Sequence, residues 1–278
     1  MSLPTELPTE LHADCSACAG LCCVALAFAR SADFGYDKPA GEPCTHLADD
    51  DRCRIHDHLR DKGFRGCTVF DCFGAGQKVT QLTFGGTSWR QDPAVRGPML
   101  AALPVMRRLH ELLWLVDAAV RAPGTSAAHP DLERARSQVD GVTRSSAADL
   151  LEVDADALRE EVNPVLRRAA DLARAGGPRG RHAGDRRLRP GADLLGAALG
   201  GRDLRGASLR GALLIAADLA GSDLGRVDLT GADLRDARLH GSDLREALFL
   251  TQVQLDAATG DPSTRLPASL RRPRHWHG

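Results

Sequence analysis

The most informative part of the sequence is a run of twelve five-residue units. Residues 192–251 read ADLLG-AALGG-RDLRG-ASLRG-ALLIA-ADLAG-SDLGR-VDLTG-ADLRD-ARLHG-SDLRE-ALFLT. Leucine fills the third position of the first eleven units, and Phe249 fills it in the twelfth. A small residue stands two positions earlier in nearly every unit, and aspartate lies between the two in seven of the twelve. A five-residue period matches neither a helix nor a strand, so the pattern predicts stacked repeats.

This A-(D/N)-L-x-x pattern closely resembles the pentapeptide-repeat family, and the resemblance covers residues 192–251. It implies a right-handed quadrilateral β-helix with four repeats in each coil. The twelve repeats then form three coils that stack over roughly 14 Å at the ~4.8 Å spacing of strands. Apolar residues that follow the repeats are expected to cap the open end of the stack: Val253, Leu255, Leu266, Leu270 and Trp276.

The second unusual feature is the placement of the cysteines. All eight lie within one segment: Cys15, Cys18, Cys22, Cys23, Cys44, Cys53, Cys67 and Cys72. The polar, acidic N-terminus lacks the basic and apolar regions of a signal peptide, which predicts a cytoplasmic protein. In a reducing compartment such a dense group of cysteines indicates metal binding by thiolates rather than disulfide bonds.

The cysteine spacing alone leaves the metal open. Cys15 and Cys18 are spaced so that both sulfurs reach one ion, whereas the adjacent Cys22 and Cys23 diverge and more naturally serve two ions or a polynuclear cluster. Eight thiolates can fill two four-sulfur zinc sites, hold an iron–sulfur cluster beside a second site, or bind several Cu(I) ions. We favour thiolate-bound zinc, with the iron–sulfur cluster and Cu(I) as alternatives. Weaker candidate ligands are His46, His56 and His58.

The cysteine segment also resembles a known family. The succession is Cys15-x2-Cys18-x3-Cys22-Cys23, Pro43-Cys44-Thr45-His46-Leu47, Cys53-Arg54-Ile55-His56 and Cys67-x4-Cys72. Over residues 12–75 this order is similar to the cysteine-cluster family of zinc- or iron-chelating domains, although His56 stands where that family often has tyrosine. The resemblance implies metal binding, and the family has no single established chemistry.

Helices are predicted between the cysteines and the repeats. Apolar residues recur at three- and four-residue steps from Pro98 to Ala122, which predicts an amphipathic helix closed by Pro123 and Gly124. Further helical segments are expected after Pro130, after a capping Ser146, and from Leu158 to Gly176 with a kink at Pro164.

Together these features predict an α+β multidomain protein, in which an N-terminal cysteine-rich metal-binding and helical domain precedes a right-handed quadrilateral β-helix. The expected segments are a cysteine-cluster metal-binding region (1–95), a helical region packed on it (96–176), a linker (177–191), the repeat β-helix (192–251) and a C-terminal cap (252–278).

Charge and hydropathy narrow the range of functions. Residues 192–250 carry nine acidic side chains and seven arginines, a net charge of −2. Duplex DNA carries about one negative charge per 1.7 Å, so the repeats fall far short of the gyrase-protecting DNA mimicry known in the pentapeptide-repeat family. The overall net charge of −1 argues against nucleic-acid binding as well. No apolar stretch is long enough for a transmembrane helix, so no membrane contact is expected.

The sequence therefore predicts a metal-binding protein, with a cysteine-thiolate site carried on a pentapeptide-repeat scaffold. Leu195, Leu213 and Ile215 cluster on an outward face where polar residues are expected. Such a patch marks a docking surface for a protein partner or small substrate, unless the protein's own helical region covers it. The alternative is a metalloenzyme with redox or modification chemistry at the thiolate–metal centre. No Ser/His/Asp set, phosphate loop or dinucleotide fingerprint points to a named reaction.

Overall fold

The computed structural model describes residues 8–276, and the chain is about 39% helical. It divides into two compact units. One, here called the cysteine–helix unit, comprises Leu7–Asp117 and Asp131–Pro164. The other, here called the repeat unit, includes Ala118–Pro130 and Val165–Gly278.

The helical elements fall into short turns around the cysteines and long helices after them. The α-helices are α1 (Leu21–Ala25), α2 (Arg65–Thr68), α3 (Ala75–Lys78), α4 (Pro93–Arg121), α5 (His129–Thr143), α6 (Ala147–Leu151), α7 (Ala155–Ala175) and α8 (Gln252–Ala257). The 3-10 helices are η1 (Thr9–Leu11), η2 (Cys15–Ala17), η3 (His56–His58) and η5 (Ser126–Ala128), and η4 (Val79–Thr83) is a π-helical turn.

The predicted helices are confirmed. The helix α4 begins five residues earlier than expected, at Pro93, and ends at Arg121. Ser146 caps α6, because its side-chain oxygen accepts a hydrogen bond from the backbone N–H of Asp149 (3.2 Å). Pro164 lies inside α7.

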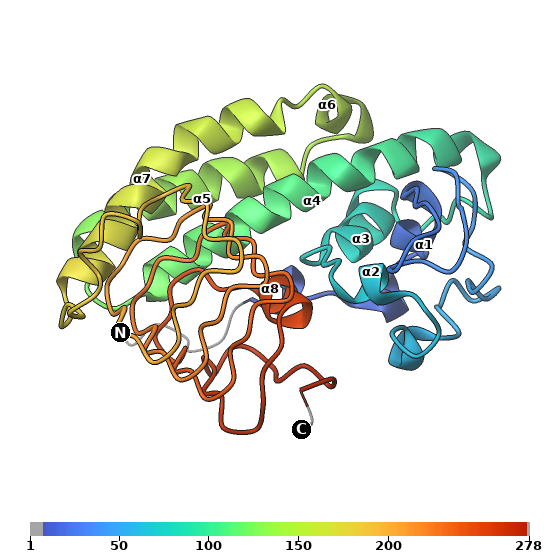
Figure 1. Ribbon diagram of the computed structural model, residues 1–278. Coiled ribbons are helices and arrows are strands. Elements are labelled where there is room, and N and C mark those ends of the chain that lie inside the picture. The colour runs from blue at the N-terminus through green and yellow to red at the C-terminus, as the bar shows by residue number, and fades with distance from the viewer. Residues whose placement is uncertain (1–7, 277–278) are drawn as a thin grey trace. The chain divides into compact units, whose positions relative to one another are not determined.

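Within the cysteine–helix unit, α4 buries one apolar face, and its charged residues join it to the other helices. Arg108 pairs with Asp156 of α7 (2.8 Å), and Glu111 pairs with Arg159 of the same helix (3.5 Å). These helices run alongside one another in Figure 1. The fully buried residues of α4 recur at the predicted three- and four-residue steps: Met99, Leu103, Met106, Leu109, Leu112 and Val116.

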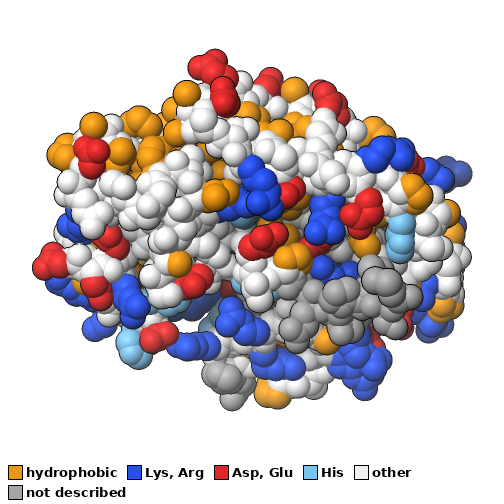
Figure 2. Space-filling model, turned by 180° about the vertical axis from the view of Figure 1, so that it is seen from behind, with side chains coloured by type: hydrophobic (Ala, Val, Ile, Leu, Met, Phe, Trp, Pro, Cys, Tyr) orange, Lys and Arg blue, Asp and Glu red, His pale blue; other side chains and the backbone are white. Residues whose placement is uncertain are grey.

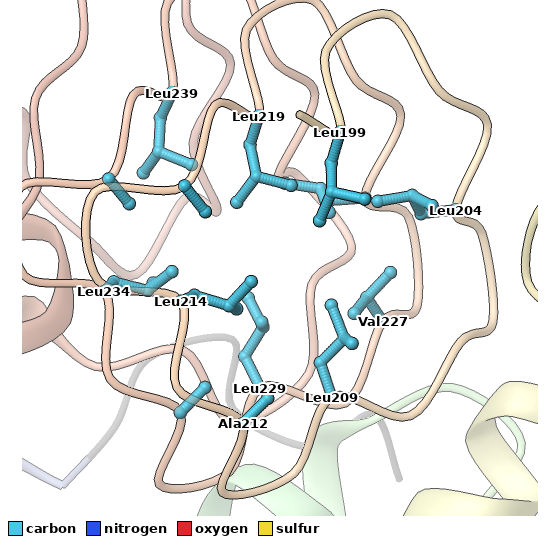
Figure 3. Packing of buried hydrophobic residues seen from close by; sticks show 14 of the residues in the cluster. Leu199, Leu204, Leu209, Ala212, Leu214, Leu219, Val227, Leu229, Leu234 and Leu239 are labelled. Atoms are coloured by element: carbon cyan, nitrogen blue, oxygen red, sulfur yellow. The ribbon is translucent and has the colours of Figure 1, made fainter. Parts of the chain in front are cut away.

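The repeat unit is a chain wound in stacked turns of twenty residues. The backbone N–H of Leu199 donates to the carbonyl of Asp218 (2.8 Å), and the N–H of Asp218 donates back to Ala197 (2.9 Å). Isolated parallel bridges join residues twenty apart, from Asp193 with Leu213 to Asp228 with Leu248. The repeat leucines point inward and stack between turns, as Leu199, Leu219 and Leu239 do in Figure 3, and all three are buried.

The predicted fold class is wrong. The right-handed quadrilateral β-helix is not seen, because residues 8–276 contain no β-strand and only isolated bridges. The reason is local. At every fifth residue from Gly191 to Gly241 the backbone turns through a positive φ, so each side is too short for two bridges in succession. A period of five therefore gives single bridges between corners rather than strands.

Segments outside the repeats pack against both ends of the coil. Residues 180–191, expected as a linker, attach to the first turn: the N–H groups of Gly180 and His182 donate to the carbonyls of Arg205 (2.9 Å) and Asp203 (3.1 Å). Beyond the last repeat, Leu255 and Trp276 are buried in the same apolar cluster as the repeat leucines. The apolar core thus extends beyond the twelve repeats at both ends.

The corners of the coil give a test of its backbone. Ala216 has φ +55°, a left-handed conformation that costs a residue with a side chain roughly 1 kcal/mol relative to glycine. Ala216→Gly is expected to raise the free energy of unfolding by about 1 kcal/mol in urea denaturation. The reverse change at Gly211 (φ +61°), where an added Cβ would meet nothing within 4 Å, should lower it by a similar amount. Equal stability of the two variants would contradict this assignment.

Candidate thiolate site

All eight cysteines lie in the cysteine–helix unit and are free thiols. Cys15 is exposed, and the other seven are half-buried. They come from loops and from the short elements η2, α1 and α2, and side-chain hydrogen bonds hold these segments in place.

The segment that carries Cys15 and Cys18 is fastened to the helix that follows Cys72. The Gln77 side chain accepts a hydrogen bond from the backbone N–H just before Cys15 (2.9 Å) and donates to the carbonyl of His12 (2.8 Å). The Thr80 hydroxyl accepts a hydrogen bond from the N–H just after Cys18 (3.1 Å). These bonds bring Cys15 and Cys18 to the start of α3, directly after Cys72.

Gly76 marks the point where two of the sulfurs meet. A Cβ at this residue would lie 2.7 Å from the Sγ atom of Cys18 and 3.9 Å from the Sγ atom of Cys72. A carbon atom does not fit at 2.7 Å from a sulfur, so a side chain at this position would push the Cys18 sulfur away from the first turn of α3.

A second set of cysteines is gathered by a tight hairpin. Leu47 and Cys53 form an antiparallel bridge, and the N–H of Arg54 donates to the carbonyl of His46 (2.9 Å). Cys44 and Cys53 are therefore on the two arms of one hairpin. The N–H of Cys44 also donates to the carbonyl of Cys23 (2.9 Å), which joins this hairpin to α1.

Backbone amides lie close to four of the sulfurs. The N–H of His46 donates to the Sγ atom of Cys44 (3.5 Å), and backbone N–H groups also lower the pKa of three other thiols: those of Leu21 and Gly20 at Cys18, of Ile55 at Cys53, and of Gly76 and Gly74 at Cys72. An N–H bonded to sulfur stabilises the thiolate over the thiol. The loops are thus built to receive negative charge on sulfur.

Burial opposes this ionisation in most of the thiols. It raises the pKa of Cys15 and Cys18 to about 11 each, and that of Cys67 to about 12, and the neighbouring thiols add to all three shifts. A hydrogen bond with Cys23 acts the other way on Cys53 and lowers its pKa to about 6. A metal ion that binds these sulfurs must therefore displace protons from several of them.

Lys38 is a buried cation beside the cysteines. Its side chain is 4% exposed, and Nζ donates to the carbonyls of Val24 (3.1 Å), Pro39 (3.1 Å) and Glu42 (2.7 Å). Burial lowers its pKa, and the largest electrostatic effects that oppose this shift come from Cys44, Cys23 and the carboxylate of Glu42. A buried ammonium group is costly unless negative charge lies close to it.

A tyrosine completes the surroundings of Cys44. The Tyr36 oxygen accepts hydrogen bonds from the N–H and the hydroxyl of Thr45 (3.0 Å each). Its own hydrogen is then directed at the Sγ atom of Cys44, 3.1 Å away. Aromatic rings pack around Tyr36, with centroids 5.3 Å away for Phe28 and 5.6 Å for Phe64. Cys44 therefore has a hydrogen-bond donor fixed on its aromatic side.

The histidines predicted as weaker ligands differ in burial, and His56 lies near enough to Cys53 to help lower the pKa of that thiol. His46 is half-buried and packs edge-on against Phe64 (5.0 Å). The side chains of His56 and His58 are 67% and 69% exposed. Across residues 8–276, no three His, Cys, Asp or Glu side chains already stand in an arrangement that holds a metal ion. The cysteines are gathered in one place, and the sulfurs would have to close further around an ion.

Sequence reasoning missed the residues that hold Cys72 from α4. His110 is buried, and its Nδ1 donates to the carbonyl of Phe73 (2.7 Å). Arg107 Nε donates to the carbonyl of Asp71 (2.8 Å). His110 and Arg107 thus fix the backbone on both sides of Cys72. The pattern of α4 shows that His110 lies on its buried side, but nothing in the sequence indicates which loop it contacts.

The outward carboxylates of the repeats are mostly neutralised. Asp203, Asp233 and Asp243 each pair with the arginine two residues later, at 2.8, 2.7 and 2.6 Å. On the face that Figure 2 shows, acidic and basic side chains are interspersed. This surface lacks the continuous negative charge of a DNA mimic.

Comparison with known proteins identifies the type of repeat and finds a relative that aligns with the whole chain. The family of pentapeptide repeats matches eight copies, over residues 192–231 and 212–249. The chain is also 51% identical over 277 residues to the protein named Uncharacterized protein YybG of Bacillus subtilis (strain 168), with 99% of this chain and 98% of that protein aligned. The chain belongs to the YybG family. The alignment covers both the cysteine segment and the repeats of this chain. The comparisons do not confirm the cysteine-cluster family.

The three apolar residues predicted to form a docking surface on the repeats differ in exposure. Leu195 and Leu213 are 65% and 44% exposed, and Ile215 is half-buried. The end of α7 contacts the coil elsewhere, where Arg174 donates to the carbonyl of Gly206 (2.9 Å).

Of the helices within residues 8–276, none combines the length and apolar character needed to cross a bilayer.

Proposed function

We propose that the cysteine–helix unit binds metal through cysteine thiolates, and that the repeat unit is a scaffold that docks a partner protein. Zinc is the favoured metal, because it binds all-thiolate sites in small loop-rich segments. The metal would hold together a segment whose helices are only four or five residues long.

The arrangement of backbone amides around the sulfurs carries this proposal. Backbone N–H groups lie close to four of the sulfurs, and at Cys18, Cys53 and Cys72 they favour the thiolate form that a metal requires. Cysteines that only fill a core need no such donors, because a neutral thiol is a weak hydrogen-bond acceptor. The buried Lys38 adds positive charge on the same side as Cys44 and Cys23.

The proposal is tested by metal analysis and absorption spectroscopy on the full chain purified without oxygen or chelator. Colourless protein with bound zinc is the expected result. Brown protein with iron and labile sulfide, or protein with copper, would support thiolate binding but show that the metal is not zinc. Protein without metal, together with normal folding of a variant in which Cys18 and Cys72 are both serine, would refute the proposal.

Lys38 offers a prediction about charge. Lys38→Met is expected to weaken zinc binding about 10- to 100-fold in competition with a chromophoric chelator, because it removes the cation next to the thiolates. Lys38→Arg keeps the charge and serves as the matched control. Without metal, Lys38→Met should not be less stable than Lys38→Arg, since the thiols are then neutral and only the carboxylate of Glu42 remains to balance the buried cation. Equal zinc affinity of the two variants would show that the charge has no role.

The scaffold half of the proposal rests on Leu195 and Leu213, which are exposed on successive turns of the coil. Exposed leucines at outward positions are typical of a protein–protein contact. The double variant Leu195→Ser/Leu213→Asp is expected to lose co-purifying proteins when used as bait in cells of the source organism. The same proteins bound equally by the wild type and the variant would place the contact elsewhere.

A further inference from the structure

We infer that the eight cysteines form two separate four-sulfur metal sites, which divide between the neighbours Cys22 and Cys23. This inference rests on the proposed thiolate function and adds to it the number of ions and the ligands of each. The first site consists of Cys15, Cys18, Cys22 and Cys72. The second site consists of Cys23, Cys44, Cys53 and Cys67.

The first site is assembled around the start of α3. Gln77 of α3 and Thr80 of the following turn η4 fasten the segment that carries Cys15 and Cys18, at 2.9 and 3.1 Å. Gly76 places the sulfurs of Cys18 and Cys72 over one backbone position, 2.7 and 3.9 Å from where its Cβ would be. Three of the four thiols of this site are therefore positioned by residues 76–80.

The second site is assembled around the hairpin. Cys44 and Cys53 stand on its two arms, next to the bridge between Leu47 and Cys53. Cys23 is joined to the hairpin by the 2.9 Å bond between its carbonyl and the N–H of Cys44. Cys67, on α2, supplies the fourth sulfur.

The helix α1 carries the adjacent pair at the junction of the two sites. Successive side chains on a helix point about 100° apart, so the thiols of Cys22 and Cys23, which contact each other, have different further neighbours: Cys23 also contacts the thiol of Cys53. The thiols that raise one another's pKa largely follow the same division. Cys22 and Cys72 act on both Cys15 and Cys18, with a smaller effect of Cys53 on Cys15. The pKa of Cys67 is raised by Cys22, Cys44 and Cys53, in that order, so Cys22 lies at the junction.

Charge distinguishes the two sites. Lys38 lies beside the second site, because the groups that most strongly favour its charged form are Cys44 and Cys23, followed by Glu42. The tyrosine hydroxyl directed at Cys44 belongs to the same site. A four-thiolate zinc site carries a net charge of −2, so a buried cation and a hydrogen-bond donor both favour it. The polar residues that shape the first site, Gln77 and Thr80, are neutral.

The test counts zinc ions by native mass spectrometry of the full chain, reduced and loaded with zinc alone. Wild-type protein is expected to bind two ions. Cys18→Ser and Cys72→Ser, each by itself and both together, should retain one. Cys53→Ser and Cys67→Ser should likewise retain one, singly and together. A variant with Cys18→Ser and Cys53→Ser should retain none.

Gly76→Ala provides a variant that removes no ligand. Its Cβ would fall 2.7 Å from the Cys18 sulfur, so it should displace the first zinc and leave the second. If the variants that remove cysteines fail to fold, this variant still tests the division. Loading with ¹¹³Cd²⁺ should then give two cadmium resonances in the wild type, without mutual splitting, and one in Gly76→Ala.

The possible results distinguish a failure of the two-site division from a failure of the proposed metal binding. A single ion in the wild type, or loss of both ions from each single cysteine variant, would overturn the two-site division while metal binding stands. Splitting between the two cadmium signals would show a bridging sulfur and overturn it as well. Absence of any bound zinc or cadmium would overturn the proposed function itself.

Discussion

Removal of the metal is expected to unfold the segment from Cys15 to Cys72. Zinc bound to small cysteine sites contributes an apparent ~10–16 kcal/mol at neutral pH, which is comparable to the stability of a whole domain. This segment has few buried apolar residues of its own, among them Leu21, Val24 and Leu47. Limited proteolysis followed by mass spectrometry, with and without a chelator under reducing conditions, measures the effect. Cleavage sites should appear between residues 15 and 72 only after chelation.

The repeats provide the internal control for that experiment. Residues 192–251 contain no cysteine, so their cleavage pattern should be the same with and without chelator. Protease resistance of the cysteine segment that does not change on chelation would show that its fold does not depend on a metal.

The coil should be equally sensitive to a charge in its interior. Leu219 is fully buried and stacks between Leu199 and Leu239, so Leu219→Asp leaves a carboxylate without a partner in an apolar core. Loss of the leucine alone costs about 2–5 kcal/mol, and burial of the charge adds to this cost. We expect the free energy of unfolding in urea to fall by at least ~4 kcal/mol.

Leu213→Asp is the matched control for this change. The substitution is the same, but Leu213 is 44% exposed and occupies the position where most repeats carry aspartate. Its effect should stay within about 0.5 kcal/mol. Similar losses in both variants would mean that the inward and outward positions of the repeat are assigned incorrectly.

The sequence predicts which side chains fill the interior of the coil better than it predicts the backbone conformation of the coil. The leucine period defines the inward column, and every repeat leucine from Leu194 to Leu244 is buried. Strands were expected only through the resemblance to a β-helix family. The five-residue period itself works against them, because a left-handed corner recurs before a second bridge can form, even where Ala216 or Asp236 replaces glycine.

The candidate site shows what local patterns leave out. Cysteine spacing places eight thiols in one segment, but their grouping depends on contacts from distant residues. Gln77 bonds the backbone of Asp14 across 63 positions. Lys38 has no motif around it, and only its burial marks it as part of the site. The role of Gly76 likewise cannot be predicted from the sequence, because it depends on the positions of the sulfur atoms that lie above this residue.

Thiolate coordination of a metal is the central claim, and X-ray absorption at the metal K-edge tests it most directly. On the full chain as purified without oxygen, we predict a first shell of four sulfur atoms at about 2.3 Å from zinc. Substitution of Cys53 or Cys72 by serine should then halve the zinc content, while the zinc that remains keeps its shell of four sulfur atoms. A first shell made mainly of nitrogen and oxygen, at about 2.0–2.2 Å, would contradict the claim.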